Sequence, residues 1–281
     1  MSNNKNLILI DGDIIVYGIA FGCAEMSDWA DVKNSISEYM EEVTTNIGTT
    51  KYIGFLQGSK NFRTTVATQA PYKGNRKSSS KPFWFNSVRD HLVEAYKFVI
   101  VDGMETDDAL TILHKRLADL EPVIATVDKD LLQSPGRHYN FRTKELSFST
   151  EYAGLDMLAE QIITGDSTDN IKGLYRVGPV KAQKILSAAE TKGDFLPLAL
   201  QAYLNYYTEL KKKEKSVITD EEVFLKAVKH FAETFELVFL RRDMDEEEFP
   251  TPEITDLLTL ENPLLHGAGK RAEGDIETIF D

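Results

Sequence analysis

Acidic residues stand directly behind short apolar runs of this chain, and this pattern constrains the fold more than any other feature. Leu7–Ile10 leads straight into Asp11, and Val123–Val127 leads into Asp128. Apolar runs of this length, alternating with segments of helical spacing, are typical of buried parallel strands joined by helices. Ligand-binding groups gather at the carboxyl ends of such strands. The sequence therefore predicts an α/β fold with a mostly parallel central sheet, flanking helices and acidic groups along one edge.

The expected elements divide the chain into three parts. Strands are expected over Asn6–Val16, Lys51–Leu56, Tyr96–Val101 and Pro122–Val127, a β excursion over Arg137–Ser149, and helices over Thr106–Leu120, Leu155–Thr164, Val180–Ala189, Phe195–Lys212 and Glu221–Leu240. This assigns residues 1–165 to an α/β core, which includes a polar, basic loop or arch over about 58–91. Residues 166–240 form a helical region, and residues 241–281 form an acidic C-terminal segment.

The distribution of charge matters more than the net charge of −13. From Lys51 to Lys97, nine Lys and Arg face only two acidic residues, a net of +7. From Asp243 to Asp281, twelve acidic residues face two basic ones, a net of −10. A chain that separates its charges in this way can offer a local basic surface to phosphate groups despite an acidic total. The acidic end is expected to be a solvated surface element.

The remaining composition limits the class of protein. Its one cysteine, Cys23, rules out an internal disulfide and fits a reducing compartment, where we expect it to be a small buried apolar residue. The apolar runs are far shorter than the roughly 20 residues that span a bilayer, so no membrane association is expected. Met1–Asn6 is polar and leads into a strand, which predicts no signal peptide.

Four acidic motifs carry the functional prediction. They are Asp11-Gly-Asp13, Glu105-Thr-Asp107-Asp108, Asp128-Lys-Asp130 and Gly165-Asp166-Ser-Thr-Asp169-Asn170. Taken singly, the second motif is as typical of a helix cap as of a metal site, and the third is more typical of a surface turn than of a metal site. Taken together, so many carboxylates can share a pocket only if cations neutralise them. Oxygen ligands favour Mg²⁺ or Mn²⁺, and two such ions form the usual clamp for hydrolysis of a phosphodiester.

These motifs resemble those of the FEN/PIN-like 5′→3′ exonucleases, a family that includes phage 5′ exonucleases and flap endonucleases. The resemblance runs from about Leu7 to Ala188. It also includes Tyr72-Lys-Gly-Asn-Arg-Lys77 in the basic segment and Val177-Gly-Pro-Val-Lys-Ala182, which resembles the hairpin of a helix-three-turn-helix element. The resemblance implies a PIN/FEN-like sheet, a helical arch and a metal-dependent 5′-nuclease activity.

The resemblance also implies roles for individual residues. It places one metal ion near Asp11, Glu105 and Asp107 or Asp108, and a second near Asp128, Asp130, Asp166 and Asp169. Lys73 and Arg76 match arch residues that polarise the scissile phosphate, a cationic role expected where negative charge develops. The residues expected to bind the substrate are Tyr17, Tyr72, Lys77, Gly178, Lys181 and Lys184. Tyr17 is as typical of a core aromatic residue as of one that stacks on a base.

Two positions depart from the family pattern. An Asp is common after the second strand, where this chain has Leu56-Gln57-Gly58, so Gln57 is a candidate neutral substitute at the first metal site. The hairpin has Arg176-Val-Gly178 where Gly-x-Gly is usual, and a side chain at the first position argues against a bound K⁺.

The sequence leaves several alternatives open. Leu-Ile-Leu-Ile-Asp-Gly-Asp also resembles the nucleophile motif of haloacid-dehalogenase-type phosphatases, and a DNA-binding member of the fold without catalysis would keep the same pattern. Within the nuclease prediction, exonuclease and flap endonuclease remain alternatives, as do DNA and an RNA–DNA hybrid as the substrate. We expect a monomer in the cytoplasm, which is the host cytoplasm if a phage encodes the chain.

Overall fold

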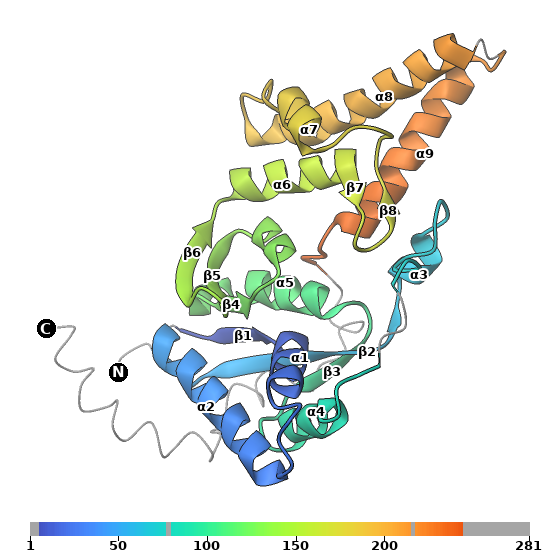
Figure 1. Ribbon diagram of the computed structural model, residues 1–281. Coiled ribbons are helices and arrows are strands. Elements are labelled where there is room, and N and C mark those ends of the chain that lie inside the picture. The colour runs from blue at the N-terminus through green and yellow to red at the C-terminus, as the bar shows by residue number, and fades with distance from the viewer. Residues whose placement is uncertain (1–5, 77–79, 215–216, 244–281) are drawn as a thin grey trace, which may run out of the picture.

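A six-stranded sheet forms the centre of the protein in the computed structural model, which describes residues 6–76, 80–214 and 217–243 (Figure 1). The strand order is β3-β2-β1-β4-β5-β6, with β1 to β5 parallel and β6 antiparallel to β5. The order reverses between β1 and β4, which opens a crevice at the carboxyl edge between them. This confirms the predicted mostly parallel sheet. The strands are β1 (Ile8–Asp11), β2 (Tyr52–Asn61), β3 (Val99–Gly103), β4 (Val123–Thr126), β5 (Gly136–Asn140) and β6 (Glu145–Ser149).

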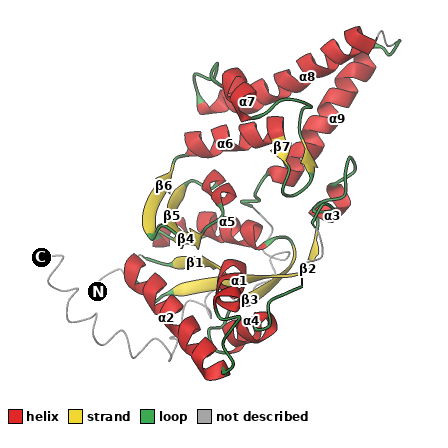
Figure 2. Cartoon of the chain, in the orientation of Figure 1, coloured by secondary structure: helices red, strands yellow, loops and turns green. Residues whose placement is uncertain are grey.

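Helices cover both faces of the sheet because successive side chains of a strand point to opposite sides. Ile8 and Ile10 of β1 join the apolar cluster under α1, α2 and α4. Leu7 and Leu9 join the cluster under α5, on the other face. All four side chains are buried. Figure 2 shows the helices on the two faces of the sheet. The helices are α1 (Gly12–Gly22), α2 (Trp29–Ile47), α4 (Phe85–Glu94) and α5 (Thr106–Arg116), with short 3₁₀ turns at η1 (Ala118–Leu120) and η2 (Lys129–Gln133).

A helical region with its own apolar cluster follows the sheet (Figure 1). The last helix returns to the sheet, where Leu240 packs into the cluster beneath α5. A small hairpin of β7 and β8 connects the first two helices and carries the fourth acidic motif. The elements are α6 (Glu151–Thr164), β7 (Gly165–Asp166), β8 (Ile171–Lys172), α7 (Pro179–Leu186), η3 (Lys192–Asp194), α8 (Phe195–Glu214) and α9 (Asp220–Val238).

The first predicted strand is too long. The strand ends at Asp11, and the apolar residues after it belong to α1, because an uninterrupted apolar run does not distinguish a strand from a buried helix. Gly12 makes the sharp change of direction possible. A Cβ at this position would lie 2.5 Å from the carbonyl oxygen of Phe55 in the neighbouring strand.

The basic segment is also more regular than predicted. The strand β2 continues to Asn61, the short helix α3 (Arg63–Val66) follows, and α4 begins at Phe85. The long helix α2 was not assigned from the sequence, although its buried residues follow helical spacing. Cys23 is buried, as expected. Only residues 241–243 of the predicted acidic C-terminal segment lie inside the described residues.

Among the described residues, no helix is both long and apolar enough to cross a bilayer.

Candidate active site

The first group of carboxylates lies in the crevice at the reversal of strand order. Asp11 ends β1, Asp107 lies in the first turn of α5, and Asp128 follows β4. Burial raises the pKa of Asp11 to about 7, and the negative charges of Asp13 and Asp128 add to the effect. Burial also raises the pKa of Asp107 well above its usual range, with further contributions from Asp11 and Asp128. The three carboxylates therefore share one poorly solvated space and repel one another.

Thr126 fixes two members of this group. Its hydroxyl donates to Asp11 Oδ2 at 2.8 Å and accepts the backbone N–H of Asp128 at 3.0 Å. Thr126 is the last residue of β4, next to β1 in the sheet, so it links the ends of both strands. Sequence reasoning did not select it, because a threonine at a strand end is too common to stand out.

A second group lies beside the first, between the sheet and the β7–β8 hairpin. Burial raises the pKa of Asp130 to about 6, and the charges of Asp128 and Asp166 add to the effect. Gln161 of α6 donates to Asp130 Oδ1 at 2.8 Å. Asp166 accepts the backbone N–H of Thr168 at 2.6 Å, which shapes the turn that carries Asp169. Asp128 thus interacts with both groups.

Three residues of the basic segment contact the carboxylates directly. The hydroxyl of Tyr72 lies 2.9 Å from Glu105 Oε2 and 2.8 Å from Asp169 Oδ2. Lys73 forms an ion pair with Glu105 and lies 3.6 Å from Asp169, and Arg76 pairs with Asp169. Burial raises the pKa of Tyr72 well above its usual range, and the two carboxylates contribute, so the phenol stays protonated. The predicted arch residues therefore do reach the acidic groups.

The chemistry of these ligands fits a hard divalent cation. Every candidate donor is a carboxylate oxygen, and the raised pKa values of Asp11, Asp107 and Asp130 show negative charge that a cation would relieve. Within the described residues, no group of three or more His, Cys, Asp or Glu is arranged so that it could hold a metal ion as it stands. Lys73 and Arg76 instead neutralise part of the charge.

Asp108 has a structural role, which corrects its place among the predicted metal ligands. It is completely buried, and its two oxygens accept the guanidinium of Arg63, at 2.5 and 2.9 Å. The same guanidinium donates to the carbonyl oxygens of Leu237 and Phe239, both at 2.9 Å. The charge of Asp11 acts instead on Asp107. The sequence counted Arg63 as part of a basic surface, but it is buried.

Gln57 also has a structural role, which differs from its expected place at the first metal site. Its side chain donates to the carbonyl of Met104 and accepts the N–H of Thr106, both at 3.0 Å, so both ends of the amide are used. Asp13 contacts Gln57 and Thr106, and its charge acts on Asp11. It accepts the N–H of Gln57 at 2.9 Å and the hydroxyl of Thr106 at 3.0 Å. Arg89 lies 3.6 Å from the Asp13 carboxylate.

Of the other predicted substrate-binding residues, those that the structure describes lie on exposed surfaces. The Tyr17 side chain is 44% exposed and packs against Phe85, with 4.9 Å between the ring centroids. One part of the ring is therefore in contact with the protein and the other part is open to solvent. Lys77 lies outside the described residues. Lys184 is exposed on α7, and Lys181 donates to the carbonyl of Arg176 at 2.9 Å.

The hairpin before α7 keeps the backbone shape that glycine usually provides. Gly178 is exposed at the N-cap of α7, followed by a proline in its first turn. Arg176, at the first position of the expected Gly-x-Gly, has a φ of 61°, in the left-handed region that glycine adopts more readily. The side chain at this position is therefore tolerated at some conformational cost.

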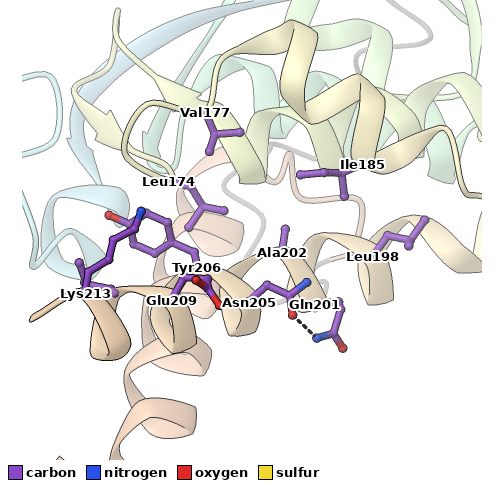
Figure 3. A pocket seen from close by; sticks show the side chains of 11 residues that line it. Leu174, Val177, Ile185, Leu198, Gln201, Ala202, Asn205, Tyr206, Glu209 and Lys213 are labelled. Atoms are coloured by element: carbon purple, nitrogen blue, oxygen red, sulfur yellow. Dashed lines mark hydrogen bonds between the residues drawn. The ribbon is translucent and has the colours of Figure 1, made fainter. Parts of the chain in front are cut away.

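An apolar groove of about 440 Å³ lies in the helical region (Figure 3). Its lining contains none of the predicted site residues and is mostly apolar, with Gln201 and Asn205 bonded to each other at 2.9 Å. It belongs to the packing of α7 against α8, and includes Leu174, Val177, Ile185, Leu198 and Ala202. The candidate active site is instead the carboxylate-lined crevice.

Comparison with known proteins agrees with this geometry. No family model matches the chain. A 5′-3′ exonuclease of Mycoplasmopsis pulmonis (strain UAB CTIP) is 24% identical over 207 residues, which cover 66% of this chain and 67% of that protein. A T5 5′-exonuclease co-crystallised with metal ions superposes with a TM-score of 0.56 at 15% identity, covering 84% of this chain and 89% of that one.

A second solved structure has the same fold. The catalytic core of Rad2 in complex with a DNA substrate superposes with a TM-score of 0.51 at 14% identity, covering 89% of this chain and 85% of that one. These solved structures establish the fold, and the curated relative links it to one group of proteins. The chain therefore shares its fold with these solved nuclease structures, and its sequence is similar to that of the curated 5′-3′ exonuclease.

Proposed function

We propose that this protein is a divalent-metal-dependent nuclease that hydrolyses phosphodiester bonds near the 5′ ends of DNA. One observation carries the proposal. Carboxylates from four separate segments converge at the reversal of strand order, and the basic residues Lys73 and Arg76 lie directly against them. Such a combination fits a site that must bind cations and a phosphodiester together. The curated relative is a 5′-3′ exonuclease, and the Rad2 structure contains DNA, which supports the same conclusion.

We propose two overlapping sets of metal ligands. Asp11, Glu105, Asp107 and Asp128 form the first set, and Asp128, Asp130, Asp166 and Asp169 form the second. Both sets follow the charge interactions seen in the structure, in which Asp128 acts on Asp11, on Asp107 and on Asp130. Two bound divalent ions supply water activation at neutral pH and stabilisation of the departing oxygen. Oxygen ligands favour Mg²⁺ or Mn²⁺.

Lys73 and Arg76 would serve two states of the site in turn. In the present arrangement they neutralise Glu105 and Asp169. With metal ions held by these oxygens, Lys73 and Arg76 would no longer be needed to neutralise Glu105 and Asp169, and both side chains could contact the scissile phosphate. A cation held beside that phosphate matters most as negative charge builds in the transition state. Tyr72, whose phenol is held between Glu105 and Asp169, would keep the basic segment in place during this exchange.

The helical region would hold the duplex. Gly178 at the start of α7, with the exposed Lys184 and with Lys181, offers a helix N-terminus and positive charge to the DNA backbone. The half-exposed ring of Tyr17, one and a half turns along α1 from Asp11, is available for stacking on a base near the cut. In this proposal residues 1–165 supply most of the catalytic groups, and Asp166 and Asp169 complete the second set of metal ligands. The rest of residues 166–240 grips the substrate.

The decisive experiment compares 5′-labelled blunt, nicked and flapped duplexes, with Mg²⁺, with Mn²⁺ and with EDTA. We expect labelled products only with the divalent ions. The preferred substrate would separate exonuclease from flap endonuclease, and an RNA–DNA hybrid in parallel would test the second kind of substrate. Hydrolysis of a small phosphate ester without cleavage of any duplex would refute the proposal and favour the phosphatase. Binding of a duplex without any cleavage would favour the DNA-binding alternative.

A further inference from the structure

One turn of α9 contacts two parts of the candidate active site that are distant in sequence. Glu233 is a buried acidic residue on this turn, 8% exposed. Its Oε1 accepts the backbone N–H groups of Thr68 and Gln69, at 2.7 and 2.8 Å. Its Oε2 accepts the hydroxyl of Thr68 at 2.5 Å. One carboxylate thus accepts three hydrogen bonds from the basic segment, more than 160 residues earlier in the chain.

The same turn also holds the β7–β8 hairpin. Thr234 donates to the carbonyl of Lys172 at 3.2 Å, and His230 Nε2 lies 3.0 Å from that oxygen. Residues three and four apart lie on one face of a helix, so His230, Glu233 and Thr234 act from a single surface. Lys172 pairs with Gly165 in the hairpin that carries Asp166 and Asp169. The turn therefore sets the basic segment and the second carboxylate group relative to each other.

The residues after Gln69 are fixed at their other end as well. The N–H of Lys73 donates to the carbonyl of Asp169 at 2.8 Å, and Asn170 donates to the carbonyl of Pro71 at 2.9 Å. Lys73 itself has a φ of 55°, an uncommon backbone conformation for a residue other than glycine. Such conformations persist only where the surrounding structure holds them. The carboxylate of Glu233 therefore holds the start of the stretch from Thr68 to Lys73, and the backbone around Asp169 holds its end.

We propose that Glu233 is a positioning residue for catalysis, which anchors Thr68 and Gln69 so that Tyr72, Lys73 and Arg76 face Glu105 and Asp169. The consequence for catalysis rests on the proposed nuclease function. The anchoring itself does not, because it is a property of the protein without substrate. Within the described residues, the hydrogen bonds of Glu233 go to Thr68 and Gln69 and not to the candidate metal ligands, so its effect on the reaction passes through the basic segment.

The first measurement is hydrogen exchange of the Thr68 and Gln69 amides in the full-length protein without DNA. Glu233→Ala removes both acceptors, and Glu233→Gln keeps one oxygen for the two N–H groups. Glu236→Gln is the matched control, because Glu236 is exposed on the same helix three residues later. We expect exchange to accelerate about 10- to 100-fold in Glu233→Ala, since hydrogen bonds to a charged group are among the stronger ones. Glu233→Gln should fall between this variant and the control.

The second measurement is the cleavage of a 5′-labelled duplex, with kcat and KM determined separately. A displaced catalytic group costs rate more than ground-state binding, so kcat should fall about tenfold or more in Glu233→Ala while KM changes little. Glu233→Gln should recover part of the loss, and Glu236→Gln should match the wild type. A melting temperature for each variant separates positioning from loss of folding.

The outcomes are distinct. Unchanged exchange at Thr68 and Gln69 would overturn the anchoring. Faster exchange with a lower melting temperature and an unchanged kcat would assign Glu233 to stability alone and overturn the positioning role. If the wild type cleaves no duplex, the proposed nuclease function fails, and hydrogen exchange still decides whether Glu233 anchors the segment.

Discussion

Replacing Asp11 with Asn should stabilise the metal-free protein at neutral and alkaline pH. Burial and the charges of Asp13 and Asp128 raise the pKa of Asp11 from 3.8 to about 7. The folded state therefore holds this proton more tightly than the unfolded chain, and folding stability falls as pH rises from about 4 to about 7. Each pKa unit corresponds to about 1.4 kcal/mol, so the ionised carboxylate costs at most about 4 kcal/mol above pH 7. Asn carries no charge and keeps an oxygen for the hydroxyl of Thr126.

The test is chemical denaturation in EDTA across pH 4 to 8. Asp11→Asn should exceed the wild type in unfolding free energy by about 2 to 4 kcal/mol at pH 8, and the difference should shrink below pH 7 and vanish near pH 4. Asp102→Asn is the control with the opposite sign, because hydrogen bonds from Ser59 and Lys60 lower the pKa of this exposed carboxylate. An Asp11→Asn variant no more stable than the wild type at pH 8 would refute the mutual repulsion. Adding Mn²⁺ should stabilise the wild type more than the variant.

Three further predictions concern the site. Asp128→Asn and Asp130→Asn should each abolish cleavage and leave duplex affinity unchanged or higher, since each removes a negative charge that repels phosphate. Single-turnover assays measure cleavage and gel-shift assays measure affinity. Full turnover by either variant would contradict the two proposed sets of metal ligands. Lys73→Ala should lower kcat by more than it weakens binding, and an unchanged kcat with a smaller salt dependence of binding would reduce Lys73 to an ordinary phosphate contact. Gln57→Asp should not tighten Mn²⁺ binding, measured by isothermal titration. It should lower the unfolding free energy by about 1 to 3 kcal/mol, because it leaves the carbonyl of Met104 without its hydrogen-bond donor. Tighter Mn²⁺ binding by this variant would restore position 57 to the first metal site.

The fold class was predictable because its signals are local. A buried strand that ends in a carboxylate is visible in four or five consecutive residues, as at Leu7 to Asp11, and parallel strands place such ends along one edge. The boundaries were less predictable. The run from Ile14 to Val16 has the same apolar character in a strand and in a buried helix, and packing beneath the sheet decided in favour of α1.

The candidate residues were predictable as types but not as partners. Nothing local distinguishes Asp107 from Asp108 in Glu-Thr-Asp-Asp. One turns toward Asp11 and Asp128, and the other is paired with Arg63, whose place on the basic segment gave no sign of burial. In the same way, Gln57 occupies the position of an expected ligand, but its amide is used by Met104 and Thr106.

The order of the parallel strands, the helices from α5 onward, the acidic motifs and the basic segment could be predicted from the sequence, because each depends on residues within one element. Which charges meet depends instead on how these elements pack together. Glu233 reaches Thr68 and Gln69, and Arg63 reaches Phe239, across more than 160 residues. Such contacts depend on where α9 returns to the sheet. The burial of apolar surface fixes that place through packing in three dimensions, and no local pattern along the chain reveals it.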